Sequence, residues 1–495
     1  MASSLQGICT STRAILTSPF EDSNLLPAGR APLALLPRDP QTCLRLAYQQ
    51  LHAVPYREVK TCWRRLYVDA ALWVVVGIVE EIIGDEESGD EWVGKVVETL
   101  DMALILTGAV GREEVVGAWF EVLEGVVGGC ADDGVRPSKR RKVDDDNDEF
   151  PRTFPDTITH MPQLKHPIPR LQELSLSAFE AKVEDPEMQI PHIIEGAIQH
   201  WPAFEEARAW KKPGYLMRKT LSGRRLVPVE IGRSYTDAGW GQKILTFRGF
   251  MREYMLEPDS PTAAAAEPCT SGHSTSDETH TENPSSAAKK DQKGYLAQHD
   301  LFAQIPSLRS DIAIPDYCYT SPVAPTSNLS NVKAVKELDE PLLNAWFGPA
   351  GTISPLHTDP YHNILAQVVG YKYVRLYAPG ETGKMYPRGM EGDGIDMSNT
   401  SCVDLDVAMG VWNEISCWDE EDEVGGGHAN GHADGRGGDA DGEEDADLEK
   451  LHPAFRTARY IEGVLGPGEC LYVPVGWWHY VRSLTPSFSV SFWWN

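Results

Sequence analysis

Apolar residues recur at three- and four-residue spacing between residues 41 and 128, a pattern typical of amphipathic helices that pack on one another. Leu44, Ala47 and Leu51 begin it, and Trp119 continues it near the end. No cluster of polar side chains accompanies these helices. The pattern predicts a small helical domain over 41–128 that packs or docks a partner. Residues 1–40 are rich in Ser, Pro, Thr and Leu without clear periodicity, so we expect them to be disordered.

The pattern changes at residue 161, where short apolar stretches bounded by Pro and Gly begin and continue to residue 495. Many short strands of this kind predict a barrel or sandwich, and the whole chain is then α+β. Two segments interrupt the strands. Residues 258–293 are rich in Ala, Ser, Thr, Glu and Pro, and residues 419–449 are acidic and rich in Gly. Neither can bury enough apolar surface to order itself, so both are expected to be disordered inserts in a domain over 161–495.

Composition excludes several classes of protein. The chain has 495 residues, 73 acidic against 45 basic, and a formal charge of −28. This charge argues against broad binding to nucleic acid or anionic membranes and favours basic partners. Nine cysteines without a C-x-x-C pair indicate neither a disulfide framework nor a structural zinc site. The apolar run at 70–79 is too short to cross a bilayer, and the N-terminus lacks a signal pattern. We therefore expect a soluble intracellular protein.

Residues 129–160 are predicted to be a linker between the two domains. Lys139, Arg140, Arg141 and Lys142 form a compact basic cluster within it, directly before an acidic run. A nuclear import receptor reads such a cluster on an exposed, flexible segment. The alternative is a solvated charge run, which is common in linkers. The cluster predicts a protein of the nucleus, with a cytoplasmic fraction left open.

The candidate chemistry lies in two short stretches of the β-rich region. His357 and Asp359 are two residues apart, and on a strand such residues project to the same face. His479 ends the second stretch and can come from a strand folded alongside. Two histidines and one carboxylate are the minimal ligand set of a non-haem Fe(II) site with open positions. We therefore predict that these three residues bind a catalytic metal ion.

The spacing around these residues follows a known pair of motifs. Gly351, His357, Asp359, Asn363 and Gly370 have the spacing of the first cupin motif. The second motif is matched by Gly468, Pro474, Gly476 and His479. In the first motif, Asp359 stands where cupins have a second histidine, and Asn363 where they have a glutamate. With stretches such as AWFGPAGTISPLHTDPYHN and VPVGWWHYVRSL, the region from about 190 to 495, inserts excepted, resembles the JmjC oxygenases.

The resemblance implies a double-stranded β-helix that uses Fe(II), 2-oxoglutarate and O2. It implies that His357, Asp359 and His479 hold the iron and that Lys372 pairs with the distal carboxylate of 2-oxoglutarate. Further contacts to this co-substrate are implied for Tyr235, Ser354 and Asn363. The residues themselves agree, because a charged lysine among the apolar strand residues of YKYVRLYAP is costly to bury unless it is paired. Taken alone, Lys372 would be read as an exposed lysine at a sheet edge.

The resemblance further implies a protein substrate. Hydroxylation of an arginine, or action on methylated basic residues of nuclear or chromatin proteins, is the main hypothesis, because the negative charge favours a cationic substrate. Two alternatives remain open. One is a 2-oxoglutarate oxygenase of another side chain or of an RNA base. The other is a cupin that binds a partner without catalysis, against which the intact ligand set and Lys372 argue.

Overall fold

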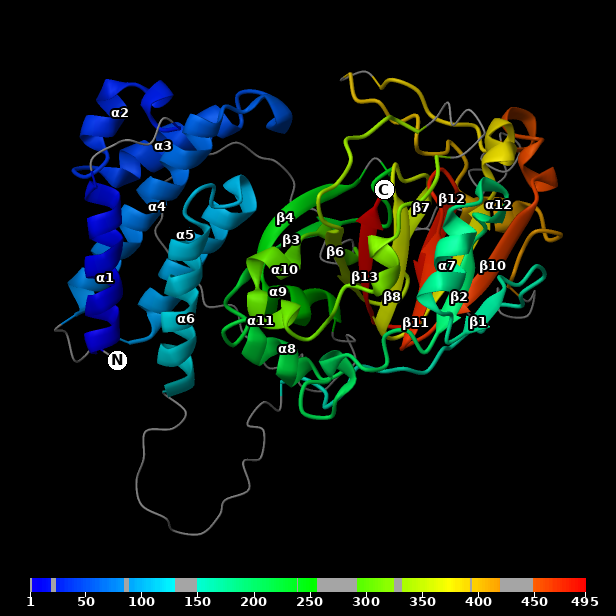
Figure 1. Cartoon of the computed structure of the whole chain (residues 1–495), viewed down its shortest axis with the longest axis horizontal. Helices are drawn as coiled ribbons and strands as arrows, with labels where there is room; N and C mark the ends of the chain where they lie inside the picture. Colours follow the sequence, from blue (N-terminus) through cyan, green and yellow to red (C-terminus); the bar gives the residue numbers. More distant parts are fainter. Residues whose placement is uncertain are drawn as a thin grey trace, which may run out of the picture. The chain divides into compact units, whose positions relative to one another are not determined.

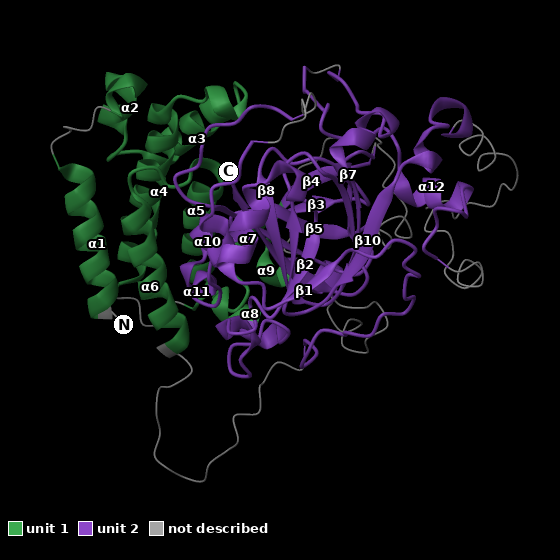
Figure 2. Ribbon diagram, turned by 45° about the vertical axis from the view of Figure 1, so that its right-hand side comes forward, with its two compact units in different colours: residues 1–146, 216–228, 244–249 green, residues 147–215, 229–243, 250–495 purple. Residues whose placement is uncertain are grey.

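The fold was analysed in a computed structural model, which describes residues 2–18, 24–83, 89–129, 149–237, 239–255, 292–324, 332–391, 394–418 and 448–495. The chain divides into two compact units, coloured separately in Figure 2. The first comprises residues 1–146 together with residues 216–228 and 244–249. The second comprises residues 147–215, 229–243 and 250–495. The predicted α+β organisation, a helical region followed by a sheet-rich region, is confirmed.

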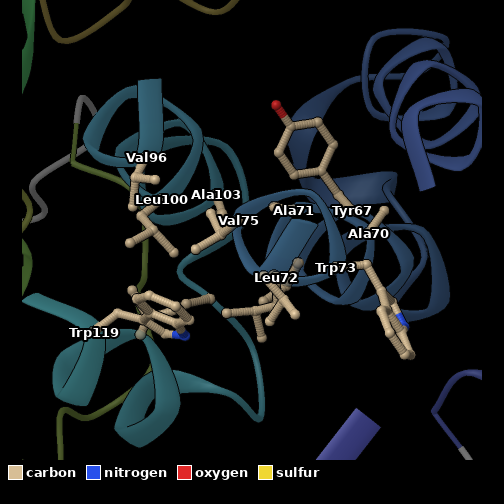
Figure 3. Packing of buried hydrophobic residues seen from close by; sticks show 14 of the residues in the cluster. Tyr67, Ala70, Ala71, Leu72, Trp73, Val75, Val96, Leu100, Ala103 and Trp119 are labelled. Carbon is tan, nitrogen blue, oxygen red and sulfur yellow. The ribbon is translucent and has the colours of Figure 1, made fainter. Parts of the chain in front are cut away.

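The first unit is built from helices that share one apolar core. They are α1 Ala2–Thr17, α2 Arg30–Leu35, α3 Pro40–Leu51, α4 Thr61–Ile82, α5 Glu91–Thr107 and α6 Glu113–Gly129. Helix α4 is apolar around most of its circumference, which is typical of a helix at the centre of a bundle. Figure 3 shows Val75 of α4 next to Leu100 and Ala103 of α5. The bundle therefore forms around α4.

The prediction that residues 1–40 are disordered is wrong where it covers α1 and α2. Leu5, Cys9 and Leu16 of α1 are buried in the common core. The indole N–H of Trp119 donates a hydrogen bond of 3.0 Å to the hydroxyl of Thr12. The many Ser and Thr residues of α1 give it low helix propensity, and packing against the other helices offsets that deficit.

The second unit is built around two sheets (Figure 1). The strands are β1 Arg170–Gln172, β2 His192–Glu195, β3 Leu226–Ile231, β4 Gly241–Thr246, β5 Gly294–His299, β6 Leu342–Gly348, β7 Ile353–His357, β8 His362–Val369, β9 Lys372–Tyr377, β10 Tyr460–Leu465, β11 Glu469–Val473, β12 Trp478–Ser483 and β13 Ser487–Trp494. Parts of β3 and β4 fall in the ranges 216–228 and 244–249 of the first unit. Short helices connect the strands: α7 Leu176–Val183, α8 Pro213–Lys219, α9 Phe247–Phe250, α10 Leu301–Gln304, α11 Pro306–Arg309 and α12 Leu405–Val411. Most of α8 and α9 falls in the ranges of the first unit. One sheet has the order β1-β2-β11-β8-β13-β6-β5-β3-β4, and the other has the order β10-β9-β12-β7.

Both sheets join segments that are far apart in the sequence. Strand β13, the last in the chain, lies between β8 and β6 and pairs antiparallel with each. Strand β12 likewise lies between β9 and β7. Consecutive residues of β8 and β13 are all buried, as expected for strands covered on both faces. The pairing of β12 with β7 brings the two sequence stretches with candidate chemistry together.

Several segments for which the sequence makes a prediction lie wholly or largely outside the described residues. The insert at 258–293 lies outside the described residues except for residues 292 and 293, and so does the insert at 419–449 except for residues 448 and 449. The basic cluster at 139–142 also lies outside them. The predicted linker at 129–160 is described from residue 149, where it belongs to the second unit. Among the described residues, no helix is both long and apolar enough to cross a membrane.

Candidate metal centre

His357, Asp359 and His479 converge at one point of the smaller sheet. His357 is the last residue of β7 and lies directly opposite His479 of β12. The Nε2 atom of His357 is 3.7 Å from Oδ1 of Asp359, and the Nε2 atom of His479 is 3.5 Å from Oδ2 of the same carboxylate. One potential ligand atom from each residue lies within 4.8 Å of the others. In the part of the chain that the structure describes, no other group of His, Cys, Asp and Glu converges in this way.

Backbone carbonyl groups orient both imidazole rings. Nδ1 of His357 is 2.7 Å from the carbonyl oxygen of Pro355, and Nδ1 of His479 is 3.1 Å from that of Trp477. A carbonyl oxygen can only accept, so Nδ1 carries the proton in each ring and Nε2 presents its lone pair. Burial lowers the pKa of His479 to about 4, so this ring is neutral near pH 7. His479 is therefore in the form that binds a metal ion, and the Nε2 atoms of both rings face the Asp359 carboxylate.

The three side chains face a cavity between the two sheets. Each sheet contributes a wall of alternate residues along its strands, as the period of a strand requires. The smaller sheet contributes Ser354, His357, Lys372, Val374, His479 and Val481. The larger sheet contributes Tyr295, Trp346, Asn363, Leu365, Leu471 and Val473. The cavity thus has a largely apolar wall with a few polar groups at fixed positions, which is typical of a small-molecule site.

Lys372 is the only lysine or arginine among the residues that line this cavity. It is 1 % exposed, and its ammonium group donates a 3.2 Å hydrogen bond to the hydroxyl of Tyr295. Burial lowers the pKa of Lys372 to about 7. The Tyr295 hydroxyl is also hydrogen-bonded to Ser354. A buried amine with this environment favours an anionic ligand, because a carboxylate would stabilise the charged form.

Asn363 also lines the cavity, and its side chain is nearly fully buried. Its Oδ1 atom has no hydrogen-bond partner among the described residues. A buried polar atom without a partner costs free energy, which a ligand in the cavity can recover by donating a hydrogen bond. The predicted residues Ser354, Asn363 and Lys372 therefore share one cavity with the three candidate metal ligands.

The role predicted for Tyr235, a contact to the co-substrate, stays a prediction, and its hydroxyl lies 3.4 Å from Oγ1 of Thr400. The position beside Lys372 is taken by another tyrosine. The tyrosine that the sequence prediction missed is Tyr295, which takes this position because β5 pairs with both β3 and β6 on the larger sheet. Tyr235 follows β3 in a loop, outside the strand that faces Lys372. The sequence shows a tyrosine in the strand GYLAQH. It does not show which strands pair with this one, and that pairing decides where the tyrosine lies.

A second residue missed from the sequence is Glu230. It lies directly opposite Tyr295 in the antiparallel pair of β3 and β5, so the two side chains point to the same face of the sheet. The indole N–H of Trp240 donates a 3.3 Å hydrogen bond to its carboxylate. Burial raises the pKa of Glu230. A partly desolvated carboxylate therefore stands next to a residue that lines the cavity.

The ligand atoms of this site are those that a non-haem Fe(II) ion prefers. Two imidazole nitrogens and one carboxylate oxygen converge on one side, and the other side opens into the cavity. This arrangement of two histidines and one carboxylate fits Fe(II) with open coordination positions for a co-substrate and O2. The absence of any cysteine among the cavity residues also separates this site from a structural zinc site.

Comparison with known proteins agrees with this fold. A family model described as a cupin-like domain matches residues 180–495. Lysine-specific demethylase 8 of Xenopus tropicalis is 30% identical over 91% of this chain and 86% of its own length. The protein of the same name from Danio rerio is 32% identical over 92% and 86%, respectively. Lysine-specific demethylase JMJ30 of Arabidopsis thaliana is 30% identical over 91% and 84%.

The chain therefore belongs to the JmjC group of the cupin-like family. The predicted enzyme class follows: it is an oxidoreductase of the iron- and 2-oxoglutarate-dependent oxygenases, with O2 as the second co-substrate. In such an enzyme the cofactor supplies the oxidising chemistry. The protein supplies the ligand geometry, the apolar cavity and the position of the substrate.

Proposed function

We propose that the protein is an oxygenase of basic protein side chains, which hydroxylates an arginine or oxidises a methylated basic residue. The observation that carries this proposal is Glu230, a partly desolvated carboxylate that pairs across the sheet with Tyr295, and Tyr295 lines the cavity. A cationic side chain that enters the cavity could form an ion pair with this carboxylate and stabilise its charged form. An arginine suits it especially, because a guanidinium can donate two parallel hydrogen bonds to one carboxylate. The relatives named lysine-specific demethylase support the methylated alternative.

Within this proposal, His357, Asp359 and His479 are the catalytic metal ligands. Lys372, aided by the hydroxyl groups of Tyr295 and Ser354, holds the distal carboxylate of 2-oxoglutarate. Asn363 donates a hydrogen bond from Nδ2 to an oxygen atom of the co-substrate, which has no donor of its own. The support is geometric, since the lysine is buried in the same cavity as the three ligands and forms no ion pair with any residue that the structure describes.

The reaction can be assigned by mass spectrometry. Purified protein would be incubated with Fe(II), ascorbate and 2-oxoglutarate, together with two peptide pools that contain either arginine or methylated lysine. Hydroxylation adds one oxygen atom to the peptide, whereas demethylation removes a methyl group. Succinate formation without any change in either pool would contradict a basic substrate. No succinate with any peptide would contradict catalysis and favour a partner-binding cupin.

Glu230 provides the specific test of cation recognition. Glu230→Gln keeps the shape of the side chain and removes its charge, so the KM for the basic peptide should rise by about 10- to 100-fold, the range for a charged hydrogen bond. The KM for 2-oxoglutarate should change little. Glu205→Gln, the same change at an exposed position, is the matched control. An unchanged peptide KM in Glu230→Gln would refute this role.

We further propose that the protein acts in the nucleus and that an import receptor binds Lys139–Lys142. The support is the sequence of this cluster alone. Replacing the four basic residues by alanine in a fluorescently tagged protein should shift it to the cytoplasm. An unchanged distribution would contradict the proposal, and the same change at Lys211 and Lys212 in the folded unit is the control.

A further inference from the structure

A segment well outside the two motifs covers the free edge of the metal-ligand strand. Residues 399–401 run beside residues 356–358, on the edge of β7 that does not face β12. Thr400 forms an antiparallel bridge with His357. The amide of Ser401 donates a 2.9 Å hydrogen bond to the carbonyl of Leu356. The strand that carries His357 is thus held along both edges, by β12 on one side and by this segment on the other.

Asn399 adds a side-chain contact to this pairing at the residue between the two ligands. The amide of Thr358 donates to the carbonyl oxygen of Asn399 at 2.8 Å. The side-chain amide of Asn399, through Nδ2, donates back to the carbonyl oxygen of Thr358 at 3.2 Å. One residue therefore holds both the amide and the carbonyl group of Thr358.

The orientation of Asn399 is itself set by a neighbour. Its Oδ1 atom accepts a 3.3 Å hydrogen bond from the hydroxyl of Thr400, which leaves Nδ2 facing Thr358. Thr358 is 1 % exposed, so water does not replace these contacts readily. The backbone angles of Thr358 determine the angle between His357 and Asp359. Fixing both of its peptide groups therefore fixes the relative direction of the two ligands.

A further backbone contact links Asp359 to the turn that precedes His479, the third ligand. The carbonyl oxygen of Asp359 accepts a hydrogen bond of 3.4 Å from the amide of Gly476. Gly476 lies in the turn between β11 and β12, and its φ of 76° is a left-handed value that suits glycine. Backbone contacts therefore lead from Asn399 through Thr358 and Asp359 to the turn that precedes His479.

We propose that Asn399 is a positioning residue for the metal centre. It does not belong to the ligand set, and its side-chain amide acts through the carbonyl group of Thr358. Without that contact the peptide between Thr358 and Asp359 is free to rotate, and the carboxylate loses its alignment with the two imidazoles. Groups that orient metal ligands typically change metal affinity by about 10- to 100-fold when removed.

Metal binding tests the proposal without any substrate. The dissociation constant of Mn(II), a non-oxidising substitute for Fe(II), would be measured by electron paramagnetic resonance for the full-length protein. Asn399→Ala removes both side-chain contacts, and Asn399→Asp removes only the donor to Thr358 while it keeps an acceptor for Thr400. Both variants should raise the dissociation constant by at least about 10-fold. The visible absorption spectrum of the Co(II)-loaded variants should also change, because it reports the coordination geometry.

Asn495→Ala is the matched control. The side chain of Asn495 also donates to a backbone carbonyl, that of Lys336 at 3.3 Å, and accepts from the amide of Leu338. This asparagine makes the same kind of contact at an exposed site, so its replacement should leave the Mn(II) dissociation constant and the Co(II) spectrum unchanged.

The possible outcomes distinguish an error in the role of Asn399 from an error in the assignment of the metal centre. Variants that bind Mn(II) within twofold of the wild type would overturn the role of Asn399. Weak binding by Asn399→Ala together with normal binding by Asn399→Asp would also overturn it, because the donated hydrogen bond would then be dispensable. If Asn399→Ala does not fold, judged by circular dichroism, Asn399→Asp alone decides. A wild-type protein that binds no Mn(II) would overturn the metal centre instead.

Discussion

Lys372 makes the affinity for 2-oxoglutarate depend on pH in a direction that the structure specifies. In the ligand-free protein, burial lowers the pKa of this lysine from its ordinary value of 10.5 to about 7. A carboxylate bound beside the ammonium group would raise that pKa again. Above pH 7 the free protein has lost the proton that the complex needs, so binding must take a proton from solution. The affinity should therefore fall as the pH rises.

The magnitude follows from the two pKa values. At pH 9, two units above the pKa of free Lys372, only about 1 % of the protein carries the ammonium. The dissociation constant should then be about 100-fold higher than at pH 6, which corresponds to about 2.7 kcal/mol. Below pH 7 the dependence should level off. The carboxylates of 2-oxoglutarate remain ionised throughout this range, because ordinary carboxyl pKa values lie near 4.

Two other titratable groups that line the cavity, His479 and Tyr295, do not produce this alkaline dependence. The pKa of His479 is lowered to about 4, so that ring stays neutral from pH 6 to 9. Burial raises the pKa of the Tyr295 hydroxyl, which keeps it protonated in the same range. The change in affinity is therefore assigned to Lys372.

The assay is isothermal titration of the Mn(II)-loaded protein with 2-oxoglutarate at pH 6, 7, 8 and 9, in buffers of different ionisation enthalpy. The buffer series reports proton uptake directly. Lys372→Met keeps the length of the side chain and removes the charge, so it should bind weakly at every pH and show no slope. A wild-type dissociation constant that is constant within twofold from pH 6 to 9 would refute the reasoning. An equal slope in Lys372→Met would refute it as well.

Three further changes have expected outcomes. Tyr295→Phe removes the hydroxyl beside Lys372 and should weaken 2-oxoglutarate binding by about 5- to 10-fold in the same titration, as expected for one hydrogen bond, whereas equal affinity would exclude a role for this hydroxyl. Asp101→Ala leaves the buried guanidinium of Arg225 without its carboxylate and should lower the free energy of unfolding in urea by about 3–5 kcal/mol. A loss below about 1 kcal/mol would show that Arg225 finds water or another partner. Deleting residues 488–495 removes nearly all of the strand between β6 and β8, so the protein should fail to give a cooperative thermal transition, and a normal transition would contradict the observed pairing.

Much of the site could be predicted because its signals are local. The two-residue period of a strand predicts that His357 and Asp359 project to the same side, and they do converge, although β7 ends at His357 and Asp359 lies two residues beyond it. The β-rich region and the helices over 41–128 followed from periodicity in the same way. Helix α1 was missed because its stability comes from burial of residues such as Leu5 and Cys9 against other helices, which local propensity does not contain.

What the amino-acid order determined by itself was the kind of chemistry: two imidazoles and a carboxylate at strand spacing, with a lysine in a neighbouring apolar strand. Only the tertiary structure decided which groups surround them. Tyr295 lies beside Lys372, although 77 residues separate the two partners. Asn399 reaches Thr358 across 41 residues. Such contacts depend on which strands pair and in which register, and pairing between distant segments is set by burial of the whole sheet rather than by any short stretch of sequence.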